Sequence, residues 1–190
     1  MIQETIQFKS RREWREWLLS NCRKSAGVWL IFPRRPTKVG HPRGLIYQQA
    51  RDEALCFGWI DSTVRVIDDK RLRQYFSPRR PDSLWSRFNR NKIAELIEQN
   101  LMTAYGQEVI ERAKSKGYYF LLDSVEDLLI PGELEEGFLA NEKARDIFNG
   151  LSIGRKKRIL YRIITLKTPT ARRRNVDLLL ENLMSGEKFL

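Results

Sequence analysis

The sequence has few of the residues on which several functional classes depend. Its two cysteines, Cys22 and Cys56, and its single histidine, His41, provide no metal-ligand spacing, so a zinc site is not expected and both thiols are expected to be reduced and buried. No apolar run reaches the roughly 18 residues that a membrane span needs. The opening residues 1–4 lack a basic region followed by an apolar stretch, which predicts no secretion signal and a cytoplasmic protein.

Recognisable catalytic motifs are missing as well. The chain contains no nucleophile elbow, no phosphate-binding glycine loop and no zinc signature, so it declares no reaction class and implies no cofactor. His41 lies in a segment rich in glycine and proline, where a solvated loop histidine is favoured over a catalytic one.

Basic residues are abundant. Lysine and arginine number 35 against 24 acidic residues, which gives a formal net charge of +11. Most of the basic residues are arginines, whose planar guanidinium suits carboxylate and phosphate partners. The charge therefore favours an anionic small molecule, an acidic protein or nucleic acid as a partner, although charge alone defines neither fold nor task.

The apolar pattern predicts an α+β fold. Residues 28–32 form a short apolar run typical of a buried strand, and residues 60–67 and 71–77 read as the two arms of a hairpin. We expect a small antiparallel sheet of about three strands, packed by helices, in an α+β domain at residues 1–122. An all-helical part is expected to follow at residues 123–190.

The stretch Glu53–Ser62 lies where a predicted helix over residues 45–57 gives way to a strand. Gly58 stands at this junction, where a positive φ is expected. Glu53 borders the apolar stripe of the helix, so its carboxylate needs a partner. Either a structural ion pair with a neighbouring arginine or a place on the rim of a cleft would supply one.

The segment Ser77–Ser86 follows the hairpin and is predicted to form one structural unit with the first stretch. Asp82 or Ser83 is expected to cap a helix that begins at Leu84. Two arginines beside a helix N-terminus suggest an anion site. The candidate ligand-binding residues are Glu53, Trp59, Asp61, Arg79, Arg80, Ser83 and Trp85.

In this hypothesis Arg79, Arg80 and the helix start at Ser83 hold the anion. Trp59 and Trp85 supply apolar walls, and Glu53 or Asp61 orients the arginines. The tetrad Pro-Arg-Arg-Pro occurs at residues 33–36 and again at 78–81. The four arginines would converge if the two strand ends lie at one edge of the sheet, and chance recurrence in an arginine-rich chain is the alternative.

A second basic region lies in the C-terminal part. Thr168 and Pro169 predict a helix start, and cations in the first turn of such a helix are disfavoured by its dipole. A solvated basic face and a ligand-binding face both fit this pattern. The candidate basic-surface residues are Arg155, Arg158, Arg162, Arg172 and Arg173.

Several of these segments resemble the YdeI/OmpD-associated, or bacteriocin-protection, family. The resemblance is carried by Glu53–Ser62, by Phe76–Pro81, by Ser83–Ser86 with Asn89, and by Lys167–Pro169 with Arg172 and Arg173. It implies an α+β protein with a helical C-terminal part. It implies no settled activity, because the family name records a phenotype and an association rather than a reaction.

Three functions remain open at this point. The first is a binding or stress-protection protein with an arginine-lined anion site. The second is an enzyme in which Glu53 and Asp61 act as an acid–base pair on an anionic substrate. The third is non-specific nucleic-acid binding through the basic helices at residues 155–174, with contacts mainly to phosphates.

Overall fold

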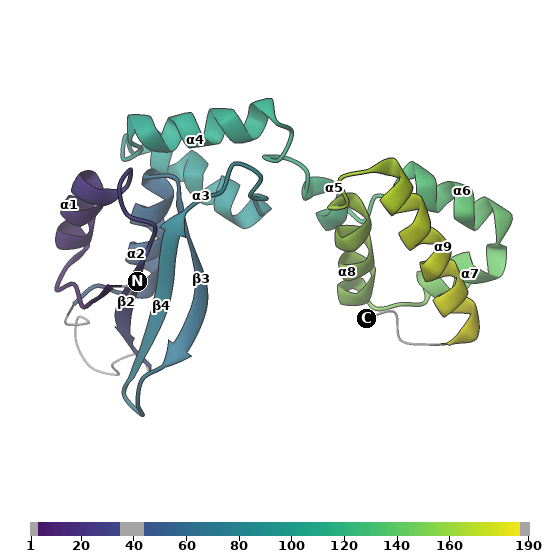
Figure 1. Ribbon diagram of the computed structural model, residues 1–190, viewed down its shortest axis with the longest axis horizontal. Helices are drawn as coiled ribbons and strands as arrows, with labels where there is room; N and C mark the ends of the chain where they lie inside the picture. The colour runs from purple at the N-terminus through teal and green to yellow at the C-terminus, as the bar shows by residue number, and fades with distance from the viewer. Residues whose placement is uncertain (1–3, 35–43, 187–190) are drawn as a thin grey trace. The chain divides into compact units, whose positions relative to one another are not determined.

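The computed structural model describes residues 4–34 and 44–186. The loop that carries His41 lies outside the described residues. The chain divides into two compact units, here called the N-terminal unit (residues 1–119) and the C-terminal unit (residues 120–190). Each unit has its own hydrophobic core, and Figure 1 shows that all labelled strands belong to the first unit.

The N-terminal unit is built on a mixed sheet, which confirms the predicted α+β class. The described strands are β1 (Thr5–Ile6), β2 (Val28–Pro33), β3 (Trp59–Val66) and β4 (Arg71–Pro78), in the order β1-β2-β4-β3. The three longer strands are antiparallel neighbours, as expected. The sheet also gains β1, which pairs in parallel with β2 and was not predicted, because two residues are too few to show an alternating pattern.

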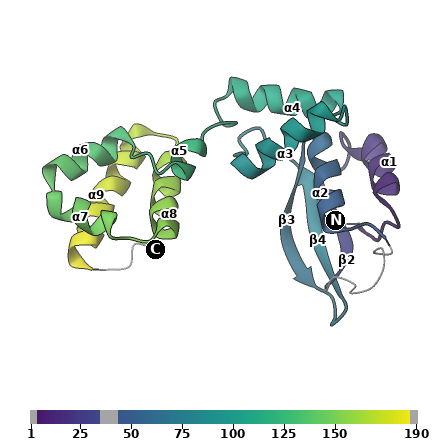
Figure 2. The same cartoon turned by 180° about the vertical axis from the view of Figure 1, so that it is seen from behind.

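Four helices complete this unit: α1 (Arg11–Asn21), α2 (Tyr47–Cys56), α3 (Arg87–Glu98) and α4 (Ala104–Ser115). Side chains at alternate positions of β2, including Val28 and Leu30, join the core with Trp14 and Leu18 of α1. Figure 2, which shows the molecule from behind, places α1 and α2 beside these strands. The opposite face of the sheet carries Trp29 and Tyr75, which pair across β2 and β4.

The junction between α2 and β3 has the predicted glycine. Helix α2 ends at Cys56, and Gly58 adopts a φ of +64° before β3 begins at Trp59. A side chain at this position would be strained by its backbone and would also meet Val109 of α4 at 2.7 Å. Glycine therefore lets the chain reverse direction directly beneath α4.

The predicted helix start at Leu84 is wrong by three residues. Helix α3 begins at Arg87, and its N-cap is Ser86, whose hydroxyl accepts from the Asn89 N–H at 3.3 Å. Leu84 and Trp85 stay outside the helix because Trp85 is packed into the core and the Leu84 carbonyl accepts a hydrogen bond from Arg79.

The two Pro-Arg-Arg-Pro segments do not start from the same edge of the sheet. Strands β2 and β4 are antiparallel, so Pro33 pairs with Arg71 at the start of β4, whereas Pro78 is the last residue of β4. At about 3.3 Å per residue, seven residues of strand separate these ends by roughly 23 Å. The hypothesis of convergence is therefore contradicted for the described part of the first segment, while Arg35 and Pro36 lie outside the described residues.

The C-terminal unit is all-helical in its described part, as expected. Its helices are α5 (Asp123–Glu126), α6 (Gly132–Ala140), α7 (Glu142–Asn149), α8 (Ile153–Ile164) and α9 (Pro169–Ser185). Thr168 caps α9 through a hydroxyl that accepts from the Ala171 N–H at 3.2 Å, and Pro169 occupies the first turn. Leu134, Phe138, Leu160 and Leu179 lie at the centre of the core. None of the helices described is long and apolar enough to cross a membrane.

The net charge is concentrated in the N-terminal unit. Residues 1–119 contain 23 lysines and arginines against 13 acidic residues, a net of +10, whereas residues 120–190 contain 12 against 11, a net of +1. A positive field is thus a property of the N-terminal unit, and any anionic partner attracted by it is drawn to that unit.

Candidate functional site

The two segments singled out in the sequence meet at the end of the hairpin. Trp59 pairs with Pro78 and Ile60 with Ser77 across β3 and β4. The backbone N–H of Arg79 then donates to the Gly58 carbonyl at 3.0 Å. The turn at Gly58 and the start of the arginine segment therefore support each other.

Arg79 is a buried cation with an incomplete set of hydrogen bonds. Its relative exposure is only 5%, and its Cζ lies 3.6 Å from the centroid of the Trp85 ring. Nη1 donates to the Leu84 carbonyl at 3.2 Å, but buried Nε and Nη2 have no acceptor among the described residues. Burial lowers the pKa of the Arg79 guanidinium to about 10, while the charges of Asp61 and Tyr119 act in the opposite direction.

Further cations surround the aromatic pair beneath Arg79. Trp85 packs on Tyr119 with ring centroids 5.4 Å apart. Arg90 of α3 and Lys114 of α4 approach the Tyr119 ring to 5.6 and 5.5 Å. We call Arg79, Trp85 and Tyr119 the Arg79 site. The sequence did not point to Tyr119, Arg90 or Lys114, because they come from three segments that only the tertiary fold brings together.

Arg80 and Ser83 lie in the loop that covers Arg79. Arg80 is exposed and Ser83 is half-buried. The Ser83 N–H donates to the Arg80 carbonyl at 3.0 Å, which closes a turn rather than opening a helix. The free N–H groups of a helix start, which the sequence placed at Ser83, are therefore not available there.

Glu53 is paired with arginines other than those expected. Its carboxylate is 2% exposed and accepts from Arg11 Nε at 2.5 Å and from Arg15 Nη1 at 2.6 Å. Arg15 also donates to the Leu101 carbonyl at 2.9 Å. Glu53 thus ties α2 to α1 instead of orienting Arg79 or Arg80, because α1 packs directly over this turn of α2.

The neighbouring thiol has no features of a nucleophile. Burial raises the pKa of Cys56 to about 11, with a further contribution from the Glu53 charge and an opposing one from Arg15. Cys22 is also buried, and burial raises its pKa. Both groups are therefore protonated near neutral pH.

Asp61 belongs to a separate network. Its Oδ2 accepts from the Tyr47 hydroxyl at 3.0 Å and from Gln74 Nε2 at 2.5 Å. Burial raises the pKa of Tyr47, and the Asp61 charge adds to this effect. The carboxylates of Glu53 and Asp61 are thus held by different partners rather than as one acid–base pair.

Trp59 is a core residue rather than the wall of an open site. It is fully buried, meets Trp14 and Trp17 edge to face, and donates its indole N–H to the Cys22 carbonyl at 3.1 Å. Of the two predicted aromatic walls, only Trp85 touches an arginine of the candidate site.

Two of the five candidate basic residues of the C-terminal unit, Arg172 and Arg173, lie beside glutamates of α6. Arg173 pairs with Glu136 at 2.9 Å, and Arg172 lies 3.8 Å from Glu133 while its Nε donates to the Leu166 carbonyl. Arg162 donates to Asn175 at 3.1 Å. Glutamates of α6 thus neutralise the first turns of α9, which accounts for arginines at a position that the helix dipole disfavours.

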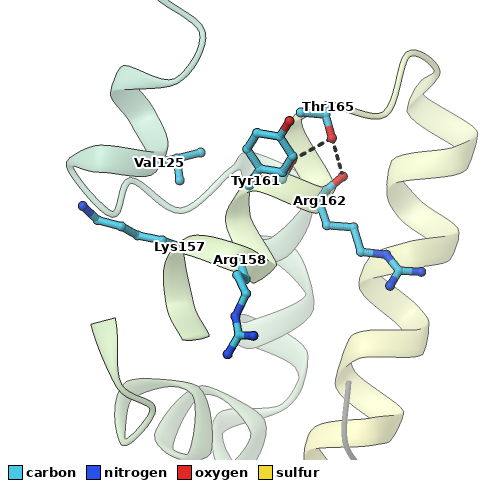
Figure 3. A pocket seen from close by; sticks show the side chains of 6 residues that line it. All are labelled: Val125, Lys157, Arg158, Tyr161, Arg162 and Thr165. Carbon is cyan, nitrogen blue, oxygen red and sulfur yellow. Dashed lines mark hydrogen bonds between the residues drawn. The ribbon is translucent and has the colours of Figure 1, made fainter. Parts of the chain in front are cut away.

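A pocket of about 480 Å³ lies beside α8. It is lined by Val125, Lys157, Arg158, Tyr161, Arg162 and Thr165. Figure 3 shows that the head groups of Lys157, Arg158 and Arg162 point in different directions, and that Thr165 bonds to backbone oxygens of its own helix. The pocket therefore has apolar walls and no convergent polar group. Elsewhere in the chain as described, no group of three His, Cys, Asp or Glu residues converges to hold a metal ion.

These features define a two-part protein, with a basic α+β domain followed by a helical bundle. Two family models match it, and each lies within one part. A domain of unknown function (DUF8412) matches residues 6–109, and the family described as "Bacteriocin-protection, YdeI or OmpD-Associated" matches residues 127–186. The chain therefore belongs to the DUF8412 family, whose model covers more than half of it, and its C-terminal unit matches the model of the YdeI/OmpD-associated family, which confirms the resemblance. No curated protein and no solved structure matches the chain significantly.

Proposed function

We propose that this protein binds a small anion, a carboxylate or a phosphate group, at the Arg79 site. The observation that carries the proposal is the pair of buried donors, Nε and Nη2 of Arg79, for which the described chain offers no acceptor. A buried charge that lacks hydrogen bonds costs several kcal/mol. An anion bridging these two donors would remove that cost through a bidentate contact.

The surroundings suit an anion better than a neutral ligand. Arg90 adds positive charge beside the Trp85–Tyr119 pair, and exposed Arg80 lies next to Arg79 in the loop. Lys114 also approaches Tyr119, but its charge is offset by Glu111 at 2.8 Å. The loop at residues 79–86 has no regular secondary structure. Because it covers Arg79 without helix or strand hydrogen bonds, it is the segment that opens to admit the ligand.

The remaining candidate residues have supporting roles in this proposal. Trp85 presents the ring on which Arg79 lies, and the charge of Asp61 favours the protonated guanidinium. Glu53 and Trp59 stabilise the scaffold. Protection against bacteriocins, which is named in the description of the family that matches residues 127–186, would in this proposal depend on whether the Arg79 site is occupied.

The test is a titration with inorganic phosphate and, separately, acetate, followed by NMR of arginine side-chain and backbone resonances. We expect shifts centred on Arg79 and Trp85 that saturate. Arg79→Lys keeps the charge but loses the planar fork and should weaken binding at least about tenfold. Arg80→Gln, at the exposed neighbour, is the control and should change affinity much less.

Equal binding by the wild type and Arg79→Lys would overturn the proposal, as would shifts spread over the surface without saturation. A high-resolution crystal structure showing only water at Nε and Nη2 in phosphate would do the same. A folded Arg79→Lys variant, shown by an unchanged circular dichroism spectrum, keeps this comparison valid.

The other two functions have less support. An acid–base pair of Glu53 and Asp61 would need both carboxylates at one reacting centre, whereas each has its own set of partners. Non-specific nucleic-acid binding through Arg155, Arg158 and the neighbouring helices would need a free positive face, whereas the C-terminal unit is almost neutral and Arg172 and Arg173 face glutamates.

A further inference from the structure

The sheet face that points away from the core carries aromatic rings and arginines together. By strand alternation, Trp29 of β2, Tyr75 and Arg73 of β4, and Arg65 of β3 lie on the side opposite Val28, Leu30 and Phe76. The register sets Trp29 opposite Tyr75, and Arg65 opposite Arg73. These four residues, from three adjacent strands, are called the sheet-face patch.

The arginines of the patch lie over the indole. Arg73 Cζ is 4.6 Å and Arg65 Cζ is 5.4 Å from the centroid of the Trp29 ring, and Tyr75 packs on the same ring at 5.2 Å. Trp29 is only 6% exposed, and these three side chains contribute to its burial. The guanidinium groups of Arg65 and Arg73 therefore lie on the solvent side of the Trp29 ring, on the outer face of the sheet.

These guanidinium groups have no anionic partner in the part of the chain that the structure describes. Among residues 4–34 and 44–186, none forms an ion pair or a hydrogen bond with the side chain of Arg65 or Arg73. Arg71, on the same strand, is in contrast paired with Asp68. Lys70 and Arg34 are exposed at the hairpin end of the same strands, where the Arg34 N–H donates to the Lys70 carbonyl.

We propose that the sheet-face patch binds single-stranded nucleic acid. Bases stack on aromatic rings and on guanidinium planes, and the N–H groups at the edges of the same guanidinium groups bind phosphates. The +10 charge of the N-terminal unit favours the approach of a polyanion. The hairpin-end cations, Lys70 and Arg34, extend the track for the phosphate backbone.

The shape of the patch selects single strands over duplexes. A flat surface of three strands offers no helix or ribbon to enter a major groove. Stacking on Arg65, Arg73 and Tyr75 requires bases that are not already stacked in a pair. The guanidinium N–H groups are assigned to phosphates and the Tyr75 hydroxyl donates to the Ala26 carbonyl, so preference among sequences is expected to be weak.

This site is separate from the Arg79 site. Arg73 and Tyr75 point to the outer face of β4, while Arg79 follows the end of that strand and lies on Trp85. The inference therefore does not depend on the proposed function. A patch variant can lose oligonucleotide binding while phosphate binding is kept. In the same way, Arg79→Lys can lose phosphate binding while oligonucleotide binding is kept.

The experiment is fluorescence anisotropy of the full chain with a labelled ten-nucleotide oligothymidylate, with the matching oligouridylate, and with a ten-base-pair duplex, over a range of salt concentrations. The variant Arg65→Ala/Arg73→Ala removes two charges from the patch. The control Arg112→Ala/Lys116→Ala removes two exposed charges from the end of α4. The patch variant should weaken single-strand binding at least about tenfold and lower the salt slope by roughly 1.4, at about 0.7 per phosphate contact.

Trp29→Phe keeps an aromatic ring and should weaken binding less than the double variant does. Equal losses in the patch variant and the control would overturn the proposal, because the interaction would then be general electrostatics. Duplex binding as tight as single-strand binding would contradict it too. Competition by vesicles that contain 30% anionic lipid gives a further test. If the vesicles displace the oligonucleotide fully and the patch variant still binds the oligonucleotide as the wild type does, the oligonucleotide binds elsewhere and the proposal is wrong.

Discussion

At the scale of single residues, Glu53 and Arg79 are two buried charged side chains of the N-terminal unit with different roles. Both oxygens of the Glu53 carboxylate accept from arginines of α1, which ties α1 to α2, and within this network Arg11 keeps a buried donor, Nη2, that has no acceptor among the described residues. Arg79 is buried to a similar extent but retains two donors without acceptors. The paired Glu53 carboxylate is therefore interpreted as scaffold, and Arg79, whose only hydrogen-bonded nitrogen is Nη1, as a site, although both are charged side chains within the same pair of sequence segments.

Glu53→Ala should destabilise the protein by about 3 kcal/mol, because breaking a buried pair leaves Arg11 and Arg15 without their counter-ion. Urea denaturation followed by tryptophan fluorescence measures this change. Glu16→Ala is the control on α1, since Glu16 forms an exposed pair with Arg12. It should have almost no effect, and equal losses in the two variants would show that Glu53 is not the structural residue inferred here.

Cys56 should make stability fall between pH 9 and 10. Its pKa is about 11 in the folded chain against an ordinary value of 9.0, so the unfolded thiol ionises first and the folded state then holds more protons. Linkage predicts a loss of about 1 kcal/mol across this interval. Cys56→Ala should remove that part of the slope, and an unchanged slope would contradict the assignment. Other groups that titrate in this pH range, including Arg79, affect the stability of the wild type and of Cys56→Ala equally, so the difference between the two slopes belongs to Cys56.

At the scale of elements, the end of α2 and the start of α4 are in close backbone contact. The Cys56 carbonyl accepts from the Thr103 N–H at 3.1 Å and from its hydroxyl at 2.7 Å. A Cβ on Gly106 would lie 2.1 Å from the same carbonyl oxygen. The end of α2 therefore docks against the first turn of α4 only because residue 106 has no side chain.

Gly106→Ala should destabilise the N-terminal unit by roughly 2–3 kcal/mol, in spite of alanine's higher helix propensity, because backbone atoms must move apart. Gln107→Ala, at an exposed position of α4, should change stability by at most about 0.5 kcal/mol. Chemical denaturation of both variants tests the contact. A neutral or stabilising Gly106→Ala would show that the helices can separate at little cost.

Much of the fold could be predicted from local signals. Gly58 and Thr168 mark chain reversals and helix starts through their own conformational preferences, and both predictions are confirmed. The partners of Glu53 and Asp61 could not be predicted, because Arg15 and Gln74 are brought to them by tertiary packing. The start of α3 was missed for a related reason: a contact of Arg79 with Leu84 and Trp85 overrides the capping potential of Ser83.

At the scale of the whole molecule, the two units differ in charge, core and aromatic content. All five tryptophans lie in the N-terminal unit, and Trp14, Trp59 and Trp85 are almost fully buried there. The C-terminal unit has its own core around Leu134 and Leu160. Tryptophan fluorescence consequently reports the folding of one unit, while far-ultraviolet circular dichroism reports helices of both.

Leu160→Ala should separate the two signals. Removing a fully buried leucine costs about 2–5 kcal/mol, and here the loss falls on the C-terminal core. The dichroism transition should broaden toward lower denaturant while the fluorescence transition stays in place. Leu18→Ala, in the N-terminal core, should shift the fluorescence transition instead. Movement of the fluorescence transition by Leu160→Ala would indicate that the units unfold as one.

In strand β4, even-numbered and odd-numbered residues face opposite sides of the sheet. Leu72, Gln74 and Phe76, at even positions, serve the interior, while Arg73 and Tyr75, at odd positions, serve the outer face. An insertion or deletion of one residue within the strand would exchange these roles and place guanidinium groups among the tryptophans. Length changes in natural variants of this hairpin are therefore expected beyond its paired residues, in the turn at residues 68–70, or within the strands only in steps of two.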